Sequence, residues 1–207
     1  MSRLRLAALT AAFALVPLLV GCGGGTGSDS GSTAALTDTL TLETKADSVA
    51  YRLLEAHGAD ALASAQYLRF NFGVESPEGS QTIARHLWDR TTGEYRVEWS
   101  SGPDSSYVAL VNVRDVTDGQ AAGTVYLNGS ALSGAAAEQA RQTAYQRFIN
   151  DTYWLLAPLK TFDPGVNRSY VADSSTAEHD VIRLTFGDVG LTPGDTYWLY
   201  VSTDTGQ

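Results

Sequence analysis

The stretch Tyr67-Leu-Arg-Phe-Asn-Phe-Gly-Val74 decides the fold class, because its apolar side chains recur at every second position. This period of two is typical of a β-strand with one buried face and one solvated face. The apolar side chains on that face are Leu68, Phe70, Phe72 and Val74. A sheet that carries such a face must cover it with another layer.

The same pattern recurs on both sides of a long helical segment. Strands are predicted at residues 83–88, 94–99, 107–113 and 123–128, and again at 169–172, 180–186 and 196–202. Short turns separate them, and Asn128-Gly129 is a favoured type I′ hairpin dipeptide. Short turns between successive strands predict an antiparallel meander, with about eight strands in one sheet.

Two helices are predicted to cover this sheet. The first spans about residues 40–57 and ends before Gly58, and residues 61–65 continue as a helical turn. The second spans about residues 134–156, between the candidate N-cap Ser133 and Pro158. Its last turns are apolar on all sides, so we expect Trp154 to be buried, and Asn150 and Asp151 to need internal hydrogen-bond partners. The pattern therefore predicts an α+β fold with one antiparallel sheet and two helices.

The N-terminus has the order of a secretory leader. A basic start (Arg3, Arg5) precedes an apolar run over residues 6–20, then Gly21 and the only cysteine, Cys22. The tetrad Leu19-Val-Gly-Cys22 resembles the lipobox of bacterial lipoproteins. That resemblance implies cleavage before Cys22, which then carries a diacylglyceryl thioether and an N-acyl chain such as palmitate. A transmembrane helix is the weaker alternative, because the run is short and contains Pro17.

This leader divides the chain into three parts. We expect a signal peptide over residues 1–21, the lipidated Cys22 with a flexible Gly/Ser tether over 22–35, and one α+β domain over 36–207. The chain ends in turn-forming residues with no return strand. Either residues 196–202 form an edge strand or the C-terminus is truncated, and the second is our expectation.

Charge excludes one class of partner. Without residues 1–21 the chain has 12 basic and 23 acidic side chains, a net charge of −11. Such a chain repels phosphate backbones, so nucleic-acid binding is not expected. It also repels an anionic membrane surface, so the lipid on Cys22 must supply the anchor.

The sequence shows no catalytic or metal-binding pattern. The three histidines, His57, His86 and His179, are far apart and lack metal-ligand spacing. The chain has no Gly-x-Ser-x-Gly elbow and no glycine-rich phosphate loop after a strand. We therefore expect no enzyme activity, no cofactor and no metal. The aromatic side chains, which include four tryptophans, are read either as core or as a concave surface for a lipid or glycan.

One segment carries a family resemblance. The run from Arg147 to Val166, followed by Tyr197-Trp-Leu-Tyr-Val201, resembles an uncharacterised family of bacterial lipoproteins. That family belongs with the LolA/LolB-like lipoprotein carriers, in which a curved antiparallel sheet wraps over helices and holds acyl chains on its concave side. The resemblance implies the same form here: a curved sheet, an incomplete barrel, wrapped over the two predicted helices. The resemblance covers roughly residues 45–202, and no ligand residue is carried over from it.

These observations predict a lipid-anchored envelope protein, on the outer membrane and facing the periplasm. We expect it to bind a lipid, an acylated protein or another amphiphile in an apolar groove lined by Leu68, Phe70, Phe72 and Val74. The alternative is a structural lipoprotein with a packed core and a protein partner in the envelope. A hydrolase is the least supported class.

Overall fold

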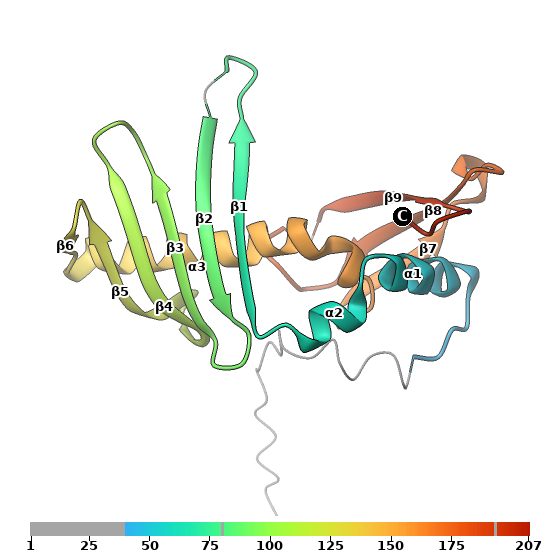
Figure 1. The fold of residues 1–207 in the computed structure, drawn as a ribbon, viewed down its shortest axis with the longest axis horizontal. Coiled ribbons are helices and arrows are strands. Elements are labelled where there is room, and N and C mark those ends of the chain that lie inside the picture. The colour runs from blue at the N-terminus through green and yellow to red at the C-terminus, as the bar shows by residue number, and fades with distance from the viewer. Residues whose placement is uncertain (1–39, 80, 193) are drawn as a thin grey trace, which may run out of the picture. The chain divides into compact units, whose positions relative to one another are not determined.

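The computed structural model describes residues 40–79, 81–192 and 194–207, so the leader and the tether, with Cys22, lie outside the described residues. The described part is a mixed α+β fold with two antiparallel sheets (Figure 1). One sheet has six strands in the order β1-β2-β3-β4-β5-β6, and the other has three in the order β7-β8-β9. The prediction of one sheet was wrong in this respect: the strands before and after the long helix form separate sheets.

The six-stranded sheet is a meander in which each strand pairs with its neighbour in the chain. Its strands are β1 (Tyr67–Glu75), β2 (Gln81–Asp89), β3 (Glu94–Ser100), β4 (Ser106–Thr117), β5 (Gln120–Leu127) and β6 (Ser130–Ala131). Asn128 and Gly129 both have positive φ, at 49° and 83°, as the predicted type I′ turn requires. The sheet does not close into a barrel, because β1 and β6 are its two edges.

Helix α3 (Gly134–Leu156) has the predicted bounds and packs on one face of this sheet, which we call the inner face. Ala137, Ala140 and Ala144 are buried along the helix, and their small side chains allow the helix backbone to approach β4 and β5 closely. Phe148 then contacts β2 and β3, with its ring 4.9 Å from Trp88 and 5.1 Å from Tyr95. The helix therefore crosses the sheet from β5 towards β1 (Figure 1).

Helix α1 (Lys45–Ala56) packs on the three-stranded sheet. Thr44 and Asp47 form a capping box at its start, which explains why the helix begins at Lys45 and not at the predicted residue 40. Gly58 follows its end with a φ of 78°, as predicted, and the short helix α2 (Ala59–Ser64) leads into β1.

The three-stranded sheet consists of β7 (Val166–Tyr170), β8 (His179–Phe186) and β9 (Thr196–Ser202). Ile182, Leu184 and Val201 face α1 and form a second core with Val49 and Leu53 of that helix. A third, smaller hydrophobic cluster lies where α1, α2 and the 3-10 helix η2 (Ala157–Leu159) meet. It connects the core of the six-stranded sheet with the core of the three-stranded sheet. Each predicted helix thus covers its own sheet.

Candidate functional site

The predicted groove residues lie together on the inner face of the edge strand β1. Leu68, Phe70 and Phe72 are half-buried, and Val74 is 57% exposed. Leu68 packs against two of the hydrophobic clusters, whereas burial decreases along the strand towards Val74. This gradient exists because α3 packs mainly on β5 and β4. The far half of β1 therefore presents apolar side chains that no helix covers completely.

A buried polar cluster adjoins this apolar strip. The side chain of His86 in β2 has no exposed surface, and the Phe70 ring stacks on it with centroids 4.3 Å apart and planes 2° apart. The Nδ1 atom of His86 lies 2.6 Å from the Tyr95 hydroxyl, and its Nε2 atom lies 3.3 Å from Oδ2 of Asp151 in α3. The sequence required an internal partner for Asp151, and the His86 ring is the buried group that lies next to its carboxylate.

Burial also fixes the protonation of one member of the cluster. It raises the pKa of the Tyr95 hydroxyl well above its ordinary value, so Tyr95 stays protonated and shares its hydrogen bond with Nδ1 of His86. On the other side of the ring, Nε2 of His86 faces the Asp151 carboxylate. The expectation that Asn150 needs an internal partner was wrong, because Asn150 is exposed. Asn150 donates to Oδ1 of Asp151 at 3.1 Å, and Arg147 lies 3.9 Å from Oδ2.

Tyr95, His86 and Asp151 resemble a nucleophile–base–acid series only in composition. His86 and Asp151 are 2% and 3% exposed, so a substrate in solution does not reach them. A role in fixing α3 against β2 and β3 accounts for the cluster. Sequence analysis missed it, although His86 stands between Ala84 and Trp88 on the apolar side of its strand.

A shallow depression of about 540 Å³ lies on the opposite, outer face of the six-stranded sheet. The side chains of Tyr67, Leu87 and Leu110 supply its apolar part, and all three are more than 40% exposed. Glu94, Arg96 and Asn112 supply polar groups at its rim. The sequence predicted a concavity between the sheet and the helices, whereas this depression lies on the face away from α3.

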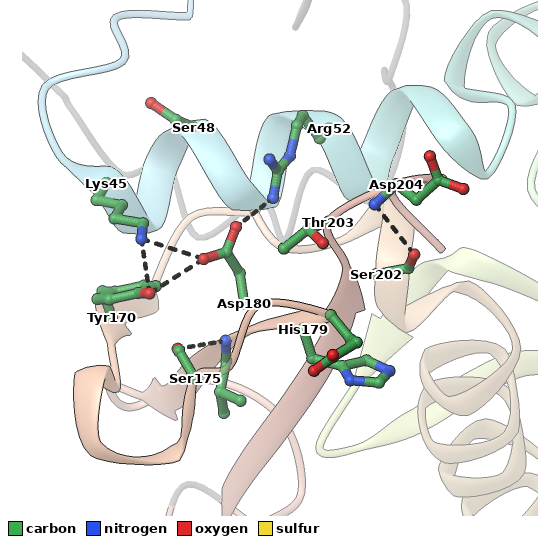
Figure 2. A network of polar contacts seen from close by, with 12 residues as sticks. Lys45, Ser48, Arg52, Tyr170, Ser175, His179, Asp180, Ser202, Thr203 and Asp204 are labelled. Atoms are coloured by element: carbon green, nitrogen blue, oxygen red, sulfur yellow. Dashed lines mark hydrogen bonds and ion pairs between the residues drawn. The ribbon is translucent and has the colours of Figure 1, made fainter.

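A second polar network joins α1 to the three-stranded sheet (Figure 2). Asp180 accepts contacts from Arg52 at 2.5 Å, from Lys45 at 3.1 Å and from the Tyr170 hydroxyl at 3.0 Å. Burial opposes the charge of Asp180, but these hydrogen bonds outweigh it and lower the pKa of the carboxyl group. The Asp180 carboxylate thus already has two cations and a hydroxyl as partners. We call this network the clamp, because it holds α1 against the three-stranded sheet.

The prediction that Trp154 is buried was wrong. Trp154 is 49% exposed and Leu155 is 45% exposed, and the Trp154 ring makes one edge contact, with Tyr197 at 5.1 Å. These residues lie in the last turn of α3, where the helix has crossed the six-stranded sheet and meets β9 instead. On the other face of β9, Trp198 and Tyr200 are 52% and 62% exposed.

Metal binding has no support in the described residues. No group of three or more His, Cys, Asp or Glu side chains is placed to hold an ion there. His57 and His179 are exposed, and the His57 ring lies 2.8 Å from the carbonyl oxygen of Leu53. In the same part of the chain, no helix is long and apolar enough to cross a membrane.

Comparisons with protein-family models, with curated proteins and with solved structures found no significant match.

Proposed function

We propose that the chain is a non-enzymatic, lipid-anchored lipoprotein of the bacterial envelope that binds an amphiphile. The anchor is Cys22, and the location is the outer membrane on its periplasmic side. The ligand is a lipid or an acylated protein, as in the LolA/LolB-like carriers that the sequence resembles. The one observation that carries this proposal is the incompletely covered inner face of β1, with Phe70, Phe72 and Val74 side by side.

This strip fits an acyl chain better than a polar ligand. Three successive inner-face side chains of a strand span roughly 14 Å, which matches about eleven methylene groups of an extended chain. Burying each methylene contributes about 0.8 kcal/mol. The walls of the strip are held in place, because Phe70 stacks on the buried ring of His86.

The test compares one substitution on each face of the same hairpin. The full chain is labelled in its membrane with a photoreactive fatty acid, and the labelled peptides are mapped by mass spectrometry. We expect Phe72→Asp on the inner face to remove the label from β1, and Leu87→Asp on the outer face to leave it unchanged. Circular dichroism checks that both variants fold.

The two variants also separate the competing sites. Loss of label in Leu87→Asp alone would move the ligand to the outer-face depression. Label that is insensitive to both changes would contradict amphiphile binding by this sheet.

The second candidate is a structural lipoprotein with a protein partner in the envelope. The exposure of Trp198 and Tyr200 on β9 favours it, since exposed aromatic side chains are enriched at protein interfaces. Trp198→Ser and Tyr200→Ser should then remove a cross-linked partner protein without changing the fatty-acid label.

A further inference from the structure

We propose that β1 is a dimerisation edge, at which a second copy of this chain adds its own β1 antiparallel to the first. The proposal concerns the edge of the sheet and does not depend on any ligand. Among the described residues β1 pairs only with β2, so its other edge is free over nine residues. The strand has no Pro and no Lys, and its two charged side chains, Arg69 and Glu75, have opposite signs, so they do not repel a second copy in an antiparallel pair.

The hydrogen bonds of the hairpin show which backbone groups are free. The Arg90 amide donates to the Gln66 carbonyl at 2.8 Å, next to the pair Tyr67 and Asp89. In an antiparallel ladder the groups of successive residues point alternately to the two sides. The even-numbered residues of β1 therefore bond to β2. The N–H and C=O groups of Tyr67, Arg69, Asn71, Gly73 and Glu75 point to the free edge.

A two-fold axis between two such edges passes beside a residue that faces its own copy, and this residue is either outward-pointing or even-numbered. An axis at an even-numbered residue, such as Phe70 or Phe72, pairs at most seven residues of each strand. An axis at Arg69 sets two arginines directly opposite each other, which is unfavourable. An axis at Gly73 pairs only the last part of the strand. An axis at Asn71 pairs all nine residues, so that Tyr67 of each copy lies opposite Glu75 of the other.

The Asn71 register is also self-complementary in its side chains. On the inner face it sets Phe70 opposite Phe72 of the second copy and Leu68 opposite Val74. These are pairs without direct hydrogen bonds, in which side chains approach most closely. On the outer face Arg69 lies opposite Gly73 and diagonal to Glu75 of the second copy. A Cβ atom at Gly73 meets nothing within 4 Å, so this side has room for the arginine.

Cysteine cross-linking of the full chain reads the register directly. Asn71 residues on the axis have Cα atoms about 5.5 Å apart, within the range of a disulfide. We expect Asn71→Cys to form a covalent dimer on mild oxidation. Arg69→Cys and Gly73→Cys are matched controls from the same face, because each is remote from its own copy. Mixing these two variants should restore the cross-link, since residues 69 and 73 lie opposite each other. The unsubstituted chain shows how much cross-linked dimer Cys22 forms by itself.

A charge pair tests the same axis without oxidation. Asn71→Lys places two like charges opposite each other and should raise the dimer dissociation constant by up to about fivefold. An equimolar mixture with Asn71→Glu should form the mixed dimer in preference to either homodimer, as measured by native mass spectrometry. A chain that stays monomeric, or cross-links that are equal at 69, 71 and 73, would overturn the proposal.

Discussion

Phe148→Ala and Trp154→Ala should have unequal effects, although both replace an aromatic residue in the second half of α3. Phe148 is 5% exposed and makes edge-to-face contacts with Trp88 and Tyr95. Truncating a buried Phe leaves a cavity that the sheet and the helix cannot close, at about 3–5 kcal/mol. That is a large part of the roughly 5–15 kcal/mol by which a domain is stable.

Trp154 has about half of its surface in water already. Its removal loses only about half of the transfer free energy of a fully buried side chain. It also leaves a surface depression that water can fill, and no closed cavity. We therefore expect a loss of about 1–2 kcal/mol. With a urea m-value of about 2 kcal/mol/M, the unfolding midpoint should fall by about 2 M for Phe148→Ala and by less than about 1 M for Trp154→Ala.

Equilibrium urea unfolding, followed by circular dichroism, measures both midpoints. The m-values should equal that of the parent chain, because a changed m-value indicates a changed denatured or native state. If Trp154→Ala lowers the midpoint as much as Phe148→Ala, the end of α3 is buried in solution and the assignment of its exposed surface is wrong.

The remaining predictions concern other parts of the chain. The lowered pKa of Asp180 gives stability that is complete above the unfolded value of 3.8 and is lost as the pH falls through the folded value. Asp180→Asn should therefore lower the free energy of unfolding by about 2 kcal/mol at neutral pH and make it less dependent on pH in the acid range. An unchanged dependence on acid pH would contradict the role of Asp180 in the clamp. Gly123→Ala should destabilise by more than about 1 kcal/mol, because its φ is 148° and a Cβ atom would lie 2.2 Å from the Leu110 carbonyl oxygen; Gly73→Ala, with no neighbour, is the control for urea unfolding. Cys22→Ser should leave an unprocessed precursor that takes up no radioactive palmitate, and processing at that site despite the change would contradict the lipobox.

The local elements could be predicted because their signals are local. The alternation in residues 67–74 and the bounds of α3 depend on neighbouring residues, and the structure reproduces them. The division into two sheets could not be predicted in this way. It depends on which strands pair after α3, and the hydrophobic period is the same in both sheets.

Trp154 and His86 both show that burial and side-chain partners depend on how distant elements pack. An apolar run at a helix end indicates burial only if a partner layer extends that far, and the six-stranded sheet ends at β1. A polar residue on the apolar side of a strand, such as His86, is a signal that the sequence does contain. Its partner Asp151 lies in another element, so the pair becomes visible only when α3 is placed on β2.

The edge strand β1 links the two proposals without making them compete. A ligand on Phe70 and Phe72 would lie on the inner face, whereas a second copy would join at the backbone edge, about 4.8 Å to the side. An added strand therefore extends the apolar face and does not cover it. In the Asn71 register the strips of the two copies run side by side, with Phe70 of one beside Phe72 of the other. Ligand affinity should then rise with protein concentration if the two strips bind one chain together, and it should be independent of concentration if each copy binds alone.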